Sequence, residues 1–150
     1  MRKSTVTILL LIFFAVLLYF YKISVSAYYT KDNYIVELIS DTKEIVFQEQ
    51  EDYVNVNVTI KNKTRNVISS QDDVFLSYHL LDSEGNTLTW DFPRSYIDAI
   101  DPFDQAIIPV TVERPAEPGK YIIEIDVVVE GKYWLKERSE RSLVIEMESI

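Results

Sequence analysis

The strongest constraint on the fold is a strict alternation of apolar and polar residues over Tyr53–Lys61. Positions 54, 56, 58 and 60 carry Val or Ile, and Asn, Thr and Lys fill the positions after them. Because successive side chains of a β-strand point to opposite faces, this pattern places the apolar set on one face and the polar set on the other. It predicts a half-buried β-strand.

Similar patterns recur along most of the chain after Asn33. Further strands are expected at residues 34–39, 44–48, 74–81, 107–113, 120–130 and 142–147. Polar or Gly- and Pro-bearing turns separate several of them, and Asp82–Asn86 indicates a hairpin loop. No segment after Tyr28 has a helical period. About seven short strands with such turns predict an all-β fold, a β-sandwich.

The N-terminus has a different character. Arg2 and Lys3 precede an uncharged apolar run that ends at Tyr21. Two interpretations stay open. Residues 4–21 are an uncleaved membrane anchor, at the short end of the roughly 17–25 residues of a spanning helix. Alternatively, the segment is a signal peptide cleaved after Ala27, although the run is longer than a usual signal core of roughly 7–15 residues.

Both interpretations place the rest of the chain outside the cytoplasm, because basic residues stay on the inner side of a membrane. The expected organisation is an anchor or signal peptide over residues 1–27, a short linker over 28–33 and one domain over 34–150. The domain is either tethered to the cell membrane by a single pass or secreted after cleavage following Ala27.

The chain is acidic and lacks cysteine. Its formal charge is −9 over 150 residues. Because three basic and no acidic residues lie before Tyr28, the remainder carries −12. Such a surface repels phosphate backbones, so no nucleic-acid partner is expected. It suits a cation, a basic partner or simple solubility. The absence of cysteine excludes disulfides and thiolate metal sites.

One local feature strengthens the sandwich prediction. Pro118–Tyr121 places a Tyr at the start of a late strand. A Greek-key sandwich often has a tyrosine corner there, in which the hydroxyl bonds back to the main chain. An ordinary core Tyr is the other interpretation.

Short segments spread over Asp52–Met147 resemble a bacterial immunoglobulin-like module of cell-envelope and polysaccharide-associated proteins. The similarity lies in residues 56–64, 76–82, Gly85, Trp90-Asp91, Arg94, 110–112, 115–121, 124–128 and 130–135. It implies an immunoglobulin-like sandwich in an envelope setting, without fixing a ligand. The chain departs from the family pattern at Val67–Ser70, where a Trp is missing, and at Asp101–Asp104, where a Pro-Gly turn is usual.

Six residues are candidates for ligand binding. His79, Glu124 and Asp126 are expected on one outer sheet face, because their strands are neighbours in such a sandwich. A polar ligand site there would include Trp90, Arg94 and Trp134, since aromatic faces stack on sugars and carboxylates accept hydroxyl hydrogen bonds. The alternative is a cross-strand salt bridge in which the carboxylates raise the pKa of His79.

The two tryptophans also leave alternatives open. Trp134 either rims a binding surface or plugs the end of the sandwich. Trp90 is either an exposed aromatic beside Arg94 or a residue with a core or edge-cap role. Glu124 and Asp126 lie at a spacing that a glycosidase pair can have, yet a flat sheet face gives no cleft.

These features predict that the chain is not an enzyme and needs no metal or cofactor. The leading hypothesis is a non-catalytic, extracytoplasmic binding module for an envelope glycan or protein. The alternative is a structural or assembly subunit of a membrane-associated envelope complex, partnering through the anchor or an edge strand.

Overall fold

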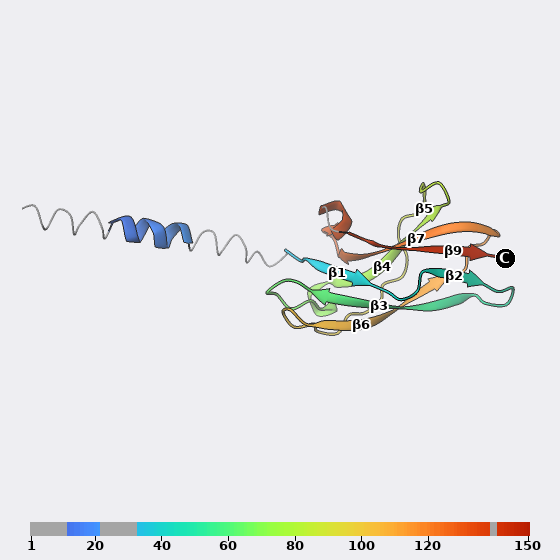
Figure 1. Cartoon of the computed structure of the whole chain (residues 1–150), viewed down its shortest axis with the longest axis horizontal. Helices are drawn as coiled ribbons and strands as arrows, with labels where there is room; N and C mark the ends of the chain where they lie inside the picture. The colour runs from blue at the N-terminus through green and yellow to red at the C-terminus, as the bar shows by residue number, and fades with distance from the viewer. Residues whose placement is uncertain (1–11, 22–32, 139–140) are drawn as a thin grey trace, which may run out of the picture. The chain divides into compact units, whose positions relative to one another are not determined.

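Two β-sheets pack face to face in the domain formed by Tyr34–Ile150 (Figure 1). The computed structural model describes residues 12–21, 33–138 and 141–150. One sheet has the order β1-β3-β6, built from β1 (Val36–Ile39), β3 (Tyr53–Asn62) and β6 (Gln105–Glu113). The other has the order β2-β9-β7-β4-β5, with β8 paired to β7. Its strands are β2 (Glu44–Phe47), β4 (Val74–Asp82), β5 (Thr87–Thr89), β7 (Gly119–Val129), β8 (Tyr133–Trp134) and β9 (Leu143–Ser149).

The first extended segment switches from one sheet to the other. β1 pairs antiparallel with β3, whereas β2 pairs parallel with β9. At the crossing the Ser40 hydroxyl donates to the Asn57 carbonyl oxygen at 2.8 Å. This split first strand, together with the strand orders of the two sheets, is an immunoglobulin-like arrangement. The prediction of an all-β, immunoglobulin-like sandwich is confirmed.

All seven predicted strands are present, with each end within two residues of its expected position. The sequence patterns do not predict β5 and β8. Strands of two or three residues are too short to show an alternation. Two short 3-10 helices, η1 (Ser70–Asp72) and η2 (Leu135–Arg138), complete the domain.

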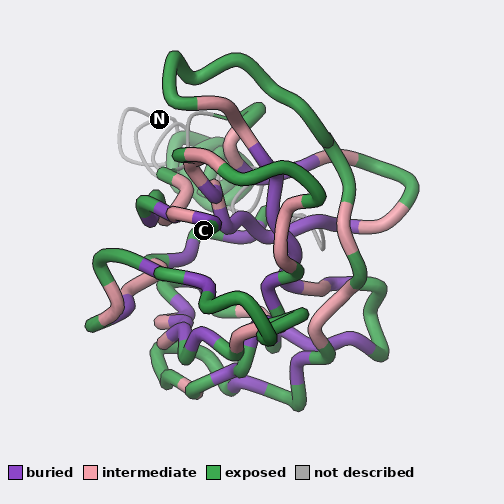
Figure 2. The backbone as a smooth tube through the Cα atoms, turned by 90° about the vertical axis from the view of Figure 1, so that its right-hand side faces the viewer, coloured by how far each residue is buried: buried purple, intermediate pink, exposed green. Residues whose placement is uncertain are grey.

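The core lies between the sheets and follows the predicted alternation. In β3, Val56, Val58 and Ile60 are at most 1% exposed, while the residues between them face outward. Figure 2 shows buried and exposed residues alternating along the backbone in this way. The inner face of β7 supplies Ile123 and Ile125, both fully buried. Burial of these branched side chains is the main source of stability, at about 25 cal/mol per Å² of apolar surface.

Two predicted turn features are also confirmed. The Asp82–Asn86 loop joins β4 and β5, and the Asp82 amide donates to the Asn86 carbonyl at 2.9 Å. The Tyr121 hydroxyl donates to the Glu117 carbonyl oxygen at 2.8 Å. Tyr121 therefore forms a tyrosine corner at the start of β7.

The N-terminal segment is described only in part. Residues 12–21 form a helix whose side chains are all exposed. Within the described ranges, none of the helices has the length and apolar character needed to cross a membrane. The rest of the expected anchor over residues 4–21 and the cleavage position after Ala27 lie outside these ranges. The anchor and the signal peptide both stay predictions.

Candidate functional site

The fold brings the six candidate residues together on the outer side of the six-stranded sheet. His79 lies in β4 opposite Glu124 of β7, and Asp126 follows two residues later on the same face. Trp134 of β8 pairs with Val128 of β7. Trp90 and Arg94 come from the segment after β5. With Lys136 of η2, we call this set the outer cluster: His79, Trp90, Arg94, Glu124, Asp126, Trp134 and Lys136.

His79 is the buried centre of the outer cluster. Its ring stacks on Trp90 with centroids 4.1 Å apart and lies 4.3 Å from the Trp134 ring. It is 0% exposed. His79 thus lies on the expected outer side of the sheet but is not accessible to solvent. Alternation assigned the correct side of the sheet, but the segment after β5 and the β8–η2 region cover that side.

The hydrogen bonding of His79 fixes its tautomer. Nδ1 contacts the carbonyl oxygen of Trp90, which only accepts, so Nδ1 carries the proton. Nε2 is buried and has no partner among the described residues. Burial lowers the pKa of His79 and outweighs the opposing effects of the Trp90 carbonyl and nearby carboxylates. The alternative of a salt bridge that raises this pKa is therefore wrong.

Glu124 is held by two partners rather than left free for a ligand. Its carboxylate accepts from the Lys136 ammonium and from the Ser142 hydroxyl. Burial raises its pKa, but the contacts with Lys136 and Ser142 outweigh burial and leave the pKa below its usual value. The side chain is a half-buried anchor for η2.

Asp126 also lies on the expected outer side of the sheet, but it is buried there. It is 1% exposed because η2 packs over it. Its carboxylate accepts the main-chain amide of Val127 at 2.8 Å and that of Lys136 at 3.0 Å. Burial raises its pKa to about 6 despite these hydrogen bonds.

The two tryptophans have different roles. Trp134 is 8% exposed and packs against His79 on the outer side of the sheet, and it also contributes to the lining of a surface hollow. Trp90 is 42% exposed. Of the two interpretations of Trp90, the structure therefore agrees with an exposed aromatic. Its ring also covers His79. Arg94 pairs with Asp91 and Glu130, and its guanidinium lies 5.1 Å from the Trp134 ring centre.

Lys136 is a residue of the outer cluster that the sequence patterns do not indicate. Its ammonium pairs with Glu124 and lies 4.9 Å from the Trp90 ring centre, while its amide binds Asp126. It therefore connects β7, η2 and the segment after β5. The only available signal was its spacing two residues after Trp134, which is not distinctive.

An open hollow of about 310 Å³ lies beside the outer cluster. Trp90, Arg94 and Trp134 contribute to its lining together with residues 128–133 and Glu137. Aromatic, cationic and carboxylate groups therefore meet at one surface depression. That combination is able to hold a polar ligand with an apolar face.

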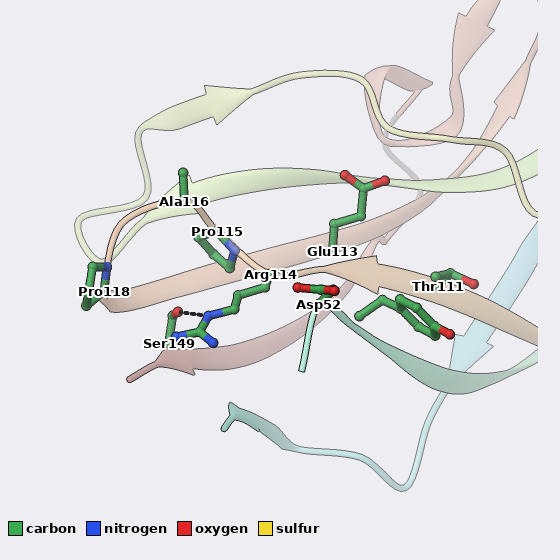
Figure 3. Close-up of a pocket in the computed structure, with 9 residues that line it drawn as sticks. Asp52, Thr111, Glu113, Arg114, Pro115, Ala116, Pro118 and Ser149 are labelled. Carbon is green, nitrogen blue, oxygen red and sulfur yellow. Dashed lines mark hydrogen bonds between the residues drawn. The ribbon is translucent and has the colours of Figure 1, made fainter. Parts of the chain in front are cut away.

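A larger hollow of about 620 Å³ lies at the end of the sandwich where β6 ends (Figure 3). Arg114 occupies it and points to Ser149, whereas the Glu113 carboxylate points away. Arg114 Nε donates to the Ser149 hydroxyl at 3.2 Å and Nη1 donates to the Gln48 carbonyl at 2.9 Å. Because its donors are committed to the fold, Arg114 acts as a clamp between β2, β6 and β9.

In the ranges that the structure describes, no group of three or more His, Asp or Glu residues is arranged to hold a metal ion. The acidic residues of the outer cluster are instead paired with Lys136, Ser142 and main-chain amides.

Comparison with known proteins supports the fold alone. No protein-family model matches the chain, and no curated protein matches its sequence. The domain is similar to part of a β-glucosidase from Listeria innocua solved in complex with glucose, with a TM-score of 0.51 and 16% identity. That match covers 81% of this chain and 17% of the enzyme. It therefore concerns one module-sized part of the enzyme.

A second similar structure is the CARDB domain of a Pyrococcus furiosus protein, solved in complex with di-metal ions. The TM-score is 0.48 at 13% identity, and the match covers 79% of this chain and 88% of that one.

Proposed function

We propose that this chain is a non-catalytic binding module that acts outside the cytoplasm on an envelope glycan or an envelope protein. The observation that carries the proposal is the hollow beside the outer cluster. Trp90 is half-exposed there and is held in place by His79 on its ring and by the Lys136 ammonium above the same ring. A fixed aromatic beside Arg94 is a pre-organised contact for a ligand.

A binding role is favoured over catalysis by the state of the two carboxylates. Glu124 and Asp126 both accept hydrogen bonds that hold η2 on the sheet. A glycosidase pair must instead face each other across a substrate. The hollow is also open to solvent, so it offers little of the water exclusion that enzymes use.

An extracytoplasmic location is supported by the N-terminal sequence. Helix 12–21 exposes apolar side chains on all sides, and Arg2 and Lys3 precede it. Such a segment suits a lipid environment better than water, with the basic end on the cytoplasmic side. Release of the domain after Ala27 would leave the same binding surface.

The test uses the two tryptophans as reporters, since the chain has no others and both line the hollow. The full chain in mild detergent is titrated with envelope polysaccharide and peptidoglycan fragments while tryptophan fluorescence is recorded. We expect a saturable change. Surface-immobilised ligand then measures the affinity of variants that lack a tryptophan.

Trp90→Ala is expected to weaken binding at least about tenfold, as for a central aromatic anchor. Tyr96→Ala is the matched control, because Tyr96 is another exposed aromatic of the same connecting segment, at 57% exposure. Binding that survives Trp90→Ala, or that Tyr96→Ala weakens equally, would remove the hollow as the binding site.

The alternative is a structural subunit of an envelope complex. The edge strands of the two sheets indicate which kind of contact such a subunit would use. β1, β2 and β5 are edge strands of three or four residues, and edge strand β6 carries Pro109. Short or proline-bearing edges disfavour strand addition by a partner. Assembly would then use a sheet face. Cross-linking in intact cells tests this alternative, and a domain that captures no neighbour would count against it.

A further inference from the structure

A second surface lies on the same sheet, beyond the outer cluster, where β2, β9 and β7 run side by side (Figure 1). Outward positions of these strands carry Val46, 40% exposed, and Val144, 56% exposed. Ile122 of β7 is half-buried between them and the outer cluster. Three carboxylates share the face, those of Glu44, Glu146 and Glu148. We call these six residues the acidic face.

The carboxylates of the acidic face lie close together, and little positive charge nearby neutralises them. Glu44 of β2 is aligned with Glu146 of β9, and like charges in register destabilise a sheet. Lys120 is aligned with Glu148 on β7. Among the described residues, none of the three carboxylates forms an ion pair. The remainder of the domain is itself strongly acidic and does not neutralise them.

The acidic face is also hollowed. A depression of about 190 Å³ is lined by Glu44, Lys120, Ile122, Glu146 and Glu148, together with Ser83, Tyr121 and Met147. Its lining therefore combines the apolar side chain of Ile122 with three carboxylates, which outnumber the one ammonium, that of Lys120. A lysine or arginine side chain has the matching form, because its alkyl stem packs on apolar surface while its charged head stays in a polar rim.

We infer that the acidic face docks a basic, amphipathic segment of another protein, with a lysine or arginine side chain in the depression and apolar side chains on Val46 and Val144. Charge complementarity selects this partner over an acidic or neutral one. The inference does not rest on the proposed ligand hollow, because it uses different residues on a different part of the sheet. Protection of the sheet edge by charge accounts for Glu44 on edge strand β2. It does not account for a hollow that Ile122 of β7 and two carboxylates of β9 also line.

The experiment measures peptide binding by the full chain in non-ionic detergent. The probe is a fluorescently labelled peptide of alternating Lys and Leu, and the reference is a peptide of equal length with Glu in place of Lys. We expect the Lys peptide to bind, the Glu peptide not to bind, and the affinity to fall as salt rises, because exposed charges are screened over about 10 Å at 0.1 M salt.

The decisive comparison is between two double variants that remove the same charge. Glu44→Gln/Glu146→Gln is expected to weaken binding of the Lys peptide at least about fivefold. Glu113→Gln/Glu117→Gln removes two exposed carboxylates from another part of the domain and is expected to leave the affinity unchanged. An equal loss in both doubles would mean that net charge alone attracts the peptide, and the docking face would be abandoned.

Val144→Asn tests the acidic face independently, in case Glu44→Gln/Glu146→Gln fails to fold. It keeps every charge and is expected to weaken binding about threefold or more, since it removes an exposed apolar contact. Unchanged affinity in this variant, or no binding of the Lys peptide to the unaltered chain, would overturn the inference. Trp90→Ala is expected to bind the Lys peptide normally, so failure here and failure of the ligand hollow are distinguishable.

Discussion

At the scale of single residues, His79 combines two features that are uncommon together. It is a titratable group with no exposed surface, and its Nε2 has no partner in the described part of the chain. A buried acceptor without a donor costs about 1–3 kcal/mol. Stacking on the Trp90 ring and contact with the tilted Trp134 ring offset this cost. Burial disfavours the charged form of His79 and the Lys136 ammonium adds to this effect, which together outweigh the opposing effects of the Trp90 carbonyl, Glu124 and Asp91.

Acidification is therefore expected to destabilise the domain through His79. Burial lowers the pKa of His79 in the folded state, whereas the unfolded chain has the ordinary value of about 6.5. Between these two values the unfolded chain binds the proton and the folded chain does not. The contribution of His79 to the free energy of unfolding is therefore at its maximum above about pH 6.5 and decreases as the pH falls below that value.

Urea unfolding of the unaltered chain and of His79→Phe at about pH 7.5 and about pH 5.5 measures this effect. We expect the stability difference to move in favour of the variant at the lower pH. Asp126 acts in the opposite sense. Burial raises its pKa to about 6 in the folded state, so the stability that this group contributes is lost as the pH rises from its ordinary pKa of about 3.9 towards 6. It is present in both proteins and cancels. Identical pH slopes in the two proteins would contradict the prediction.

Asn62 is a second residue whose burial could not be foreseen from sequence. Its Nδ2 donates to the carbonyl oxygens of Asn66 at 2.7 Å, Ile100 at 3.1 Å and Asp101 at 3.1 Å. Its Oδ1 accepts from the Thr64 amide and hydroxyl. The sequence of residues 62–66 indicates only a polar turn after a strand. The side chain in fact ties two distant loops together.

Asn62→Asp is expected to destabilise the domain by about 3 kcal/mol, because it sets a carboxylate against carbonyl oxygens in a buried site. Asn57→Asp is the matched control on the same strand. Asn57 is exposed, so its replacement should cost about 0.5 kcal/mol or less. Chemical denaturation measures both, and similar losses in the two variants would show that the Asn62 network contributes little.

At the scale of strands and loops, alternation predicted β3, β4 and β7 well because one face of each strand contacts the core. The same alternation named the side of the sheet on which His79 and Asp126 lie. It failed for their exposure, since a strand pattern carries no information about a loop that returns over the outer face. Here the Ser77 hydroxyl binds the Phe92 carbonyl at 2.8 Å and holds that loop against β4.

Arg114 shows how a single side chain joins elements at the end of the sandwich. Besides Ser149 and Gln48, its guanidinium contacts the carbonyl oxygen of Ile150. Arg114→Lys keeps the charge but replaces a planar fork with one compact ammonium. We expect a loss of about 1–2 kcal/mol in the free energy of unfolding, from hydrogen bonds to a charged donor.

The control for this clamp is Arg141→Lys. Arg141 is exposed and has no ion pair within the described residues. Its replacement is expected to change the stability by about 0.5 kcal/mol or less. Equal stability of Arg114→Lys and the unaltered chain in guanidinium chloride would mean that the fork geometry is dispensable.

At the scale of the whole domain, the outer cluster and the apolar core lie on opposite sides of one sheet. β4 belongs to both, because Tyr78 and Leu80 face the core while His79 faces the cluster. The segment after β5 is fastened to the core as well as to the cluster, since Phe92 stacks on Tyr78 with ring centroids 4.1 Å apart. The two regions are thus mechanically linked through one strand.

This linkage predicts that the cluster and the core unfold together. Tryptophan fluorescence reports only on the cluster, because both tryptophans of the chain lie there, whereas far-UV circular dichroism reports on all strands. We expect the two urea transitions to coincide within about 0.2 M, as for a two-state domain. Trp90→Phe leaves Trp134 as the single reporter on β8 and should give the same midpoint relation. A fluorescence transition at clearly lower urea would mean that the segment carrying Trp90 opens independently of the sandwich. The hollow that this segment helps to line would then not be a pre-organised site.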